Sequence, residues 1–186
     1  VKVDIGVHVD GYIADTAVTV CFNPKYDGLV QAAEEALKKA IESLRPGLSV
    51  SQFGSMIERT ITSRGFKPIS NLTGHQVARY LVHTGRALPN VSHFSLSKIN
   101  AGEIYAVEPF VTIADAAGKV NSQPETYIFR FMKQKSLSDQ HARRLSLFIQ
   151  KNFHTLPFTE RWLEGCVPQS HYRTAFSELL SSKSLM

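Results

Sequence analysis

The sequence predicts an α+β protein, on the strength of three observations. Residues 1–21 alternate between apolar and polar side chains around an Asp-Gly pair, as a β-hairpin does. Residues 29–44 and 49–65 carry apolar positions at helical spacing. The C-terminal stretch is rich in helical patterns and has only short strand-like runs. We therefore expect a core over residues 1–119 and a helical subdomain over residues 120–186.

The first stretch predicts two antiparallel strands joined by a tight turn at Asp10-Gly11. In the register that this turn sets, the numbers of opposite residues sum to 21. Asp4 and Asp15 then lie on one face as diagonal neighbours, roughly 7–8 Å apart, with Gly6 leaving room between them. The other face is expected to be buried and carries the apolar residues Val1, Val3, Ile5, Val7 and Val9.

Two aspartates on one face of a hairpin have two explanations. They can simply be solvated, which is the commoner case. They can also share a cation, because neighbouring like charges destabilise a sheet and aspartate is a poor strand former. Both explanations stay open on the hairpin alone.

Two amphipathic helices are expected next. Apolar residues from Leu29 to Leu44 form one stripe that Pro46-Gly47 ends. Ser49 and Gln52 have the spacing of a capping box for a second helix, which Gly65 follows. Both helices are interpreted as covers for a sheet, with no chemical role.

The stretch Asn71–Asn90 places His75 after a loop and His83 at the end of an alternating run from Gln76, which predicts a strand. A single histidine is most often structural or on the surface. Two of them could instead line one cleft, since neutral imidazole is the commonest side-chain metal ligand and handles protons near pH 7.

Glu108 interrupts a strand-forming apolar run within Gly102–Ala114. A carboxylate in such a run needs a partner, because an unpaired buried charge costs several kcal/mol. The partner is either a lysine or arginine, or a metal ion that Glu108 shares with Asp4, Asp15 and His75.

The C-terminal subdomain is expected to contain a short strand over Tyr127–Met132 and helices over Ser138–Phe153 and Ser170–Leu180. Its own core is expected to hold the aromatic residues Phe153, Phe158, Trp162 and Phe176.

Composition excludes several classes. No apolar run is long enough for a transmembrane helix, and no zinc-finger, RNP-like or Walker pattern occurs. The net charge of +5 is modest and typical of a solubilising surface. Cys21 and Cys166 predict two reduced thiols in a cytosolic protein, with a single bridge between them as the alternative.

Three motifs in this order, DIGVHVDGYIADTAVTV, NLTGHQVARYLVHTG and GEIYAVEPFVT, resemble the metal-binding core of the methionine aminopeptidases, which have the pita-bread fold. The helical segment after Glu108, including LPFTERWLE, is similar to the insertion of the type 2 enzymes. The resemblance implies an enzyme that removes N-terminal methionine from nascent proteins with two divalent ions of cobalt, manganese, iron or zinc.

Site roles follow from the resemblance alone. Asp4 would chelate one ion, Asp15 would bridge both, and His75 and Glu108 would bind the other. Glu108 would also act as general base, and His83 would contact the substrate. Val82 and Phe110, next to matched motif residues, are candidates for the methionine pocket.

The resemblance also implies a cytoplasmic monomer that meets nascent chains, with the ribosome surface as a further candidate partner, and no specific nucleic-acid binding. The closing glutamate ligand and the N-terminal half of the family are absent from these 186 residues, so we expect an internal piece with little activity alone. Two alternatives are an aminopeptidase P or prolidase, and a non-enzymatic pita-bread protein that binds RNA or protein.

Overall fold

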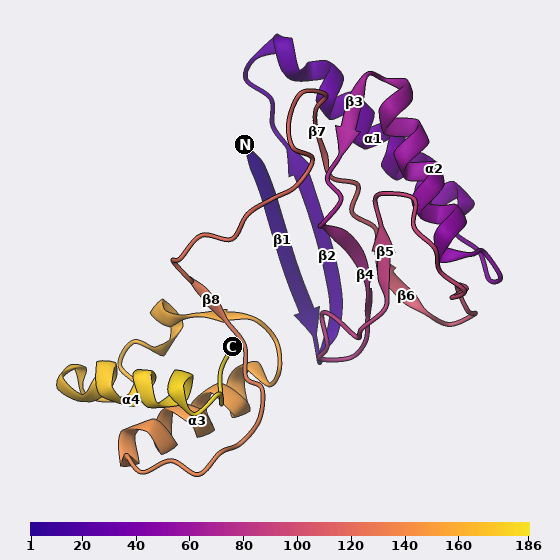
Figure 1. Ribbon diagram of the computed structural model, residues 1–186. Coiled ribbons are helices and arrows are strands. Elements are labelled where there is room, and N and C mark those ends of the chain that lie inside the picture. The colour runs from indigo at the N-terminus through magenta and orange to yellow at the C-terminus, as the bar shows by residue number, and fades with distance from the viewer. The chain divides into compact units, whose positions relative to one another are not determined.

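A computed structural model describes all 186 residues. The chain forms two compact units, Val1–Asn121 and Ser122–Met186. Each unit is described by itself (Figure 1). The first contains β1 (Lys2–Val9), β2 (Tyr12–Thr19), η1 (Pro24–Tyr26), α1 (Asp27–Ser43), α2 (Val50–Ser63), β3 (Phe66–Pro68), β4 (Thr73–Val77), β5 (Ala87–Pro89), β6 (Ile104–Ala106) and β7 (Val111–Ile113). The second contains β8 (Ile128–Phe129), α3 (Gln140–Phe153), β9 (Phe158–Thr159), η2 (Glu160–Leu163) and α4 (Gln169–Ser181).

The hairpin of β1 and β2 has the predicted register throughout, from Lys2 opposite Thr19 to Val9 opposite Tyr12. Asp10 and Gly11 both have positive φ, at 50° and 84°. This is the backbone that a two-residue turn between twisted strands requires, and an Asp-Gly pair supplies it with little strain. The alternation and the turn residues together therefore sufficed to place Asp4 and Asp15 on one face.

The burial expected of the hairpin is wrong. Its apolar face is open to solvent, with Val1 74%, Ile5 52% and Val9 76% exposed. The opposite face is the more covered one, since Ile13 and Asp15 on β2 are half-buried. Alternation shows which residues share a face but not which face has something packed on it.

Helices α1 and α2 confirm the two predicted amphipathic segments and lie side by side (Figure 1). Helix α1 contributes only alanines to the buried surface, which allows close approach. Helix α2 contributes Phe53, Ile57 and Ile61, and the side chain of its N-cap residue Ser49 accepts a hydrogen bond from the Ser51 amide. Together with Leu88 and Ile99 these side chains form the core of the first unit.

The short strands complete this unit. Strand β4 lies between β5 and β6, and β3 pairs with β7, all antiparallel. The strand expected over residues 76–83 is wrong beyond Val77, because the chain turns there and Tyr80 has a φ of 59°. Contacts with the hairpin turn hold this conformation. The Tyr80 amide donates to the Gly11 carbonyl at 2.8 Å, and Arg79 Nε donates to the Asp10 carbonyl at 2.8 Å.

Gly54 in α2 marks a close approach between this helix and the segment after β5. A Cβ at this position would lie 2.4 Å from the Val91 carbonyl oxygen. The other glycine inside a helix, Gly28 in α1, has room, because the nearest atom to its Cβ would be a ring carbon of Phe66 at 3.4 Å.

We expect Gly54→Ala to lower the free energy of unfolding by about 1–3 kcal/mol, because the steric cost exceeds the gain in helix propensity. Chemical denaturation measures the change. Gly28→Ala is the matched control and should be neutral or slightly stabilising. Equal effects of the two substitutions would contradict the close approach.

A polar cluster ties β6 to the segment before β5. The Glu103 carboxylate accepts from the Asn100 amide at 2.7 Å, from the Tyr105 hydroxyl at 2.8 Å and from Arg86 Nη1 at 2.6 Å. These contacts lower the pKa of Glu103 from 4.5 to about 2 despite partial desolvation. The backbone amide of Asn100 has the largest effect, and the Asn100 side chain, Tyr105 and Arg86 follow.

A lowered pKa stabilises the folded state above the unfolded-state value, and this contribution is lost as the pH falls from about 4.5 through about 2. We expect Glu103→Gln to lower the melting temperature at pH 7. The gap to the unsubstituted chain should shrink steadily below pH 4.5. A gap that is constant between pH 7 and pH 3 would show that the ionised carboxylate does not stabilise the fold.

The second unit forms its own core between α3 and α4, from Phe129, Leu145, Ile149, Phe158 and Phe176 among others. Of the aromatic residues expected there, Phe158 and Phe176 are buried and Phe153 packs against the cluster. Trp162 is 52% exposed, so its assignment to the core is wrong, although its ring lies 5.7 Å from that of Phe153. The short helix η2 begins at Glu160 and leaves the indole at the surface.

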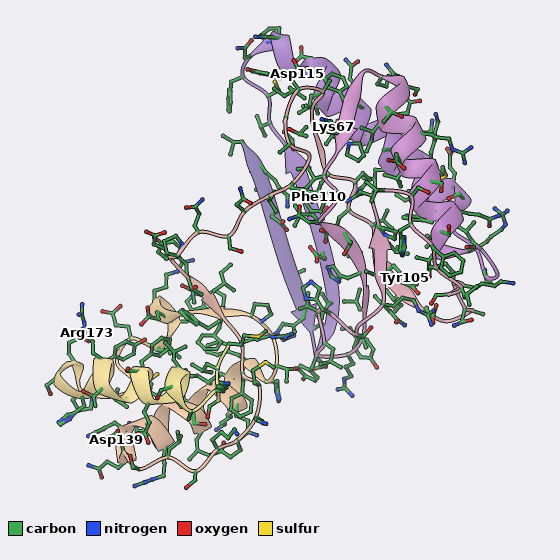
Figure 2. All side chains as sticks on the ribbon, viewed as in Figure 1. Lys67, Tyr105, Phe110, Asp115, Asp139 and Arg173 are labelled. Carbon is green, nitrogen blue, oxygen red and sulfur yellow. The ribbon has the colours of Figure 1, made fainter.

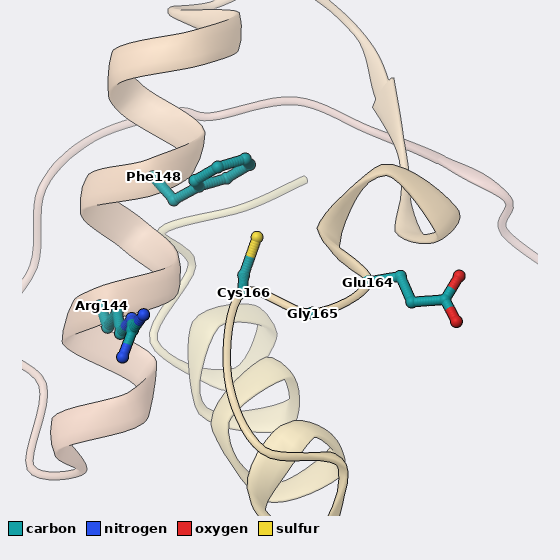
Figure 3. A pocket seen from close by; sticks show the side chains of 5 residues that line it. All are labelled: Arg144, Phe148, Glu164, Gly165 and Cys166. Carbon is teal, nitrogen blue, oxygen red and sulfur yellow. The ribbon is translucent and has the colours of Figure 1, made fainter.

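Both cysteines are free thiols. Cys166 lines a shallow pocket of about 420 Å³ with Arg144, Phe148, Glu164 and Gly165 (Figure 3). Burial raises the pKa of the Cys166 thiol, although Arg144 opposes the shift. The thiol therefore stays protonated at neutral pH, which makes it a poor nucleophile and metal ligand.

None of the helices combines the length and apolar composition needed to cross a lipid bilayer.

Candidate metal centre

Three ionisable side chains from separate segments of the first unit converge. They are Asp15 on β2, His75 on β4 and Glu108, which follows β6, and one potential ligand atom from each lies within 4.8 Å of the others. His75 Nε2 is 3.2 Å from Glu108 Oε1 and 3.7 Å from Asp15 Oδ2. Two carboxylates thus face one imidazole nitrogen.

Gly74 brings His75 and Glu108 together. A Cβ at Gly74 would lie 2.4 Å from the Ala106 carbonyl oxygen and 3.2 Å from the Glu108 amide nitrogen. His75 itself pairs with Ala87 on one side and Ala106 on the other, so its backbone is fixed at the centre of the three-stranded sheet. Its side chain is 8% exposed.

The hairpin turn helps to place Asp15. Besides the hydrogen bonds to residues 79 and 80, the Tyr80 ring fills the space where a Gly11 side chain would stand, 2.4 Å from the ideal Cβ position. The Arg79 guanidinium lies over the rings of Tyr12 and Tyr80, at 5.3 and 5.5 Å. Opposite Asp15 in the hairpin, Gly6 has no atom within 4 Å of its ideal Cβ. The hairpin is therefore anchored at its turn and open beside Asp15.

The surroundings of Glu108 disfavour a negative charge on its carboxylate. Burial raises the pKa of Glu108, and Asp15 and Asp4 raise it further, while His75 and Lys2 act in the opposite direction. Such a site favours occupation by a cation.

The donor set fits a divalent metal ion. Two carboxylate oxygens with one imidazole nitrogen suit manganese, iron, cobalt or zinc, and do not select among them. His75 Nδ1 is buried and has no hydrogen-bond partner, so the polar contacts of the ring are those of Nε2 with Asp15 and Glu108. In the neutral ring that offers the Nε2 lone pair to an ion, Nδ1 carries the proton.

Asp4 is not brought into this cluster. Its side chain is 53% exposed, and its Oδ2 lies 2.5 Å from Lys2 Nζ. It shares the face of Asp15, as expected, but its carboxylate is paired with the ammonium of its own strand. Lys2 is the residue near the site that sequence reasoning passed over, although the alternation places it on the same face as Asp4.

Of the residues expected to meet substrate, His83 lies beside the centre and Phe110 lies beside Lys2. The His83 ring is 4.0 Å from the His75 ring, centroid to centroid, with the planes tilted by 44°. Phe110 lies between β6 and β7 beside the hairpin, with Lys2 Nζ 5.0 Å from its ring centroid (Figure 2). Val82 is half-buried in the turn that precedes His83.

The sequence matches the profile of metallopeptidase family M24 over residues 1–135. The chain belongs to this family. The methionine aminopeptidase of Methanothermobacter thermautotrophicus is 41% identical over 188 residues, covering 100% of this chain and 62% of that protein. The methionine aminopeptidase of Thermococcus kodakarensis is 43% identical over 179 residues, covering 96% of this chain and 60% of that protein.

Solved structures support the pita-bread fold. A methionine aminopeptidase from Thermotoga maritima matches with a TM-score of 0.55 at 31% identity, covering 59% of this chain and 45% of that one. A thermophilic Arx1 matches with a TM-score of 0.74 over 99% of this chain and 57% of its own, but at 16% identity this likeness concerns the fold alone. The M24 chain described here spans 60–62% of the length of the two archaeal relatives.

We expect Gly74→Ala to push β4 away from β6, because the new methyl group would overlap the Ala106 carbonyl. The free energy of unfolding should fall by about 1–3 kcal/mol, and Mn²⁺ binding measured by calorimetry should weaken. Gly28→Ala, in α1 and outside the cluster, is the matched control and should neither destabilise the chain nor change Mn²⁺ binding appreciably. Unchanged stability in Gly74→Ala would contradict the role of this glycine.

Proposed function

We propose that this M24 chain is the metal-binding part of an aminopeptidase that removes methionine from protein N-termini. The observation that carries the proposal is the meeting of Asp15, His75 and Glu108 at ligand distances. The archaeal methionine aminopeptidases that resemble it along its whole length support the choice of substrate.

His75 and Glu108 would hold one ion, Asp15 would bridge to a second, and Asp4 would bind the second. A divalent ion bound there supplies Lewis acidity for the scissile carbonyl and makes a water acidic enough to attack near neutral pH. Manganese, cobalt, iron and zinc all suit these ligands. The number of ions and their identity belong to the proposal.

Glu108 is the proposed general base. Burial raises the pKa of its carboxyl, which brings it closer to the working range of an acid–base catalyst. It would take the proton of the attacking water and deliver it to the leaving amine. His83, whose ring lies 4.0 Å from that of His75, would donate to the substrate beside the scissile bond and stabilise the developing charge.

The methionine side chain would enter an apolar pocket that includes Phe110 and Val82. The wider proposal is a cytoplasmic monomer of the type 2 class that acts on nascent chains, with residues 120–186 as part of the helical insertion. The net charge of +5 is compatible with a ribosomal surface. An aminopeptidase P or prolidase activity would differ in requiring proline after the first residue.

A metal titration and a peptide assay test the proposal together. The chain should bind Mn²⁺, and Asp15→Asn should weaken binding by more than about tenfold, since changes even outside the ligand set cost that much. Turnover of Met-Ala-Ser should be slow, depend on Mn²⁺ and disappear in the variant. An Xaa-Pro peptide should not be cleaved.

Asp115→Asn is the control, because Asp115 is an exposed carboxylate and not a member of the cluster (Figure 2). Mn²⁺ binding that is equal in the Asp15 and Asp115 variants would refute the metal centre. Cleavage of Xaa-Pro in place of Met-Ala-Ser would leave the centre and overturn the substrate.

A further inference from the structure

Lys2 occupies a special position at the edge of the proposed centre. It lies on the site face of β1, two residues before Asp4, and its Nζ is 2.5 Å from Asp4 Oδ2. The same Nζ is 5.0 Å from the centre of the Phe110 ring. Both side chains of the ion pair are about half exposed, at 45% for Lys2 and 53% for Asp4.

The ion pair distinguishes Asp4 from Asp15 and Glu108, because Asp4 is paired with a lysine and the other two carboxylates face His75. One oxygen of the Asp4 carboxylate, Oδ2, already accepts a hydrogen bond from the Lys2 ammonium group. A divalent ion beside Asp4 would also stand within a few ångströms of that positive charge, and the two would repel. Binding there is therefore weakened while Lys2 stays, whereas no lysine or arginine forms an ion pair with Asp15 or Glu108, whose ion-pair partner is His75.

We propose that Lys2 is a positioning residue that serves as the built-in counter-ion of Asp4 and makes the centre load in a fixed order. One ion enters first at Asp15, His75 and Glu108. A second ion binds beside Asp4 only after the Lys2 ammonium has been displaced. The inference rests on the proposed function, since it assumes that Asp4 is a ligand of the second ion.

Phe110 gives the displaced side chain a place to stay. An ammonium group is attracted to the face of an aromatic ring, and Lys2 is already within range of Phe110. In the metal-free chain Lys2 offsets the negative charge of a face that carries Asp4 and Asp15, and with metal bound that compensation is no longer needed. The exposed pair is weak enough to open, because surface ion pairs contribute little to stability.

Calorimetric titration of the full chain with Mn²⁺ tests the order of loading. The unsubstituted chain should give a tight first ion and a weaker second one. In Lys2→Met, which keeps the unbranched stem and removes the charge, the second ion should bind about thirtyfold more tightly, the scale of repulsion between a divalent and a monovalent charge about 4 Å apart in water. The first ion should bind within about threefold of its original affinity, because Lys2 forms an ion pair with Asp4 and with neither Asp15 nor Glu108, and water and salt screen the longer separation.

Two further variants separate charge from shape. Lys2→Arg keeps the charge and should retain weak binding of the second ion. Lys25→Met removes a lysine that also lies over an aromatic ring, Tyr26 at 5.8 Å, but away from the centre, and should behave like the unsubstituted chain. The difference between Lys2→Met and the unsubstituted chain should also shrink as salt is raised, which a purely steric role for Lys2 would not cause.

The melting temperature gives a second readout. Without metal, Lys2→Met should melt at most slightly below the unsubstituted chain, because the exposed pair with Asp4 contributes little to stability. With saturating Mn²⁺ the order should reverse, since tighter binding to the folded state raises the melting temperature.

The outcomes separate the two ideas. A first ion that depends on Asp15, with a second ion unaffected by Lys2→Met, overturns the role of Lys2 and leaves the metal centre standing. Binding of Mn²⁺ that does not depend on Asp15 overturns both. An arginine variant that behaves like the methionine variant also overturns the counter-ion role.

Discussion

The convergence of negative charge on one face of a two-stranded hairpin is the constraint on which the site depends. Asp4 lies on β1, Asp15 on β2 and Glu108 in the loop after β6. Water screens Asp4 most, since its side chain is 53% exposed against 21% for Asp15 and 29% for Glu108. His75 and Lys2 are the positive partners that the fold provides. The rest of the first unit keeps Asp15, His75 and Glu108 in contact, through Gly74 on one side and the Gly11–Tyr80 contact on the other.

The scaffold divides this work among elements with different tolerances. An apolar core forms between α1, α2 and the segments that carry Leu88 and Ile99. Strand β4 is held beside this core by its pairing with β5 and β6. The hairpin contacts the rest of the unit at its turn, at mid-strand through Asp15 and His75, and near its open end through Lys2 and Phe110. Ligands carried on a rigid sheet and on a less buried hairpin can thus close around an ion without disturbing the core.

Sequence patterns predicted the parts of the structure that depend on local chemistry. The Asp10-Gly11 turn fixed the register, and the Ser49 cap and the apolar stripes fixed α2 and α1. The end of β4 at Val77 could not be predicted in this way, because contacts with Gly11, remote in sequence, hold Tyr80 at positive φ. The pairing of Asp4 with Lys2 was also missed, since alternation gives a face and no partner. Trp162 shows that an aromatic side chain in a helical segment can still lie at the surface.

The uncovered valine and isoleucine side chains of β1 affect how the chain behaves in solution. Each strand of the hairpin has an unpaired backbone edge beside an apolar face, and β1 has neither a proline nor a bulge to interrupt it. Such a surface is a template for further strands, and proteins usually protect it by covering it. The tendency of these 186 residues to associate at high protein concentration therefore depends on β1, the same strand that carries Asp4. One face of β1 carries Asp4, and its opposite face carries the exposed apolar side chains that favour association.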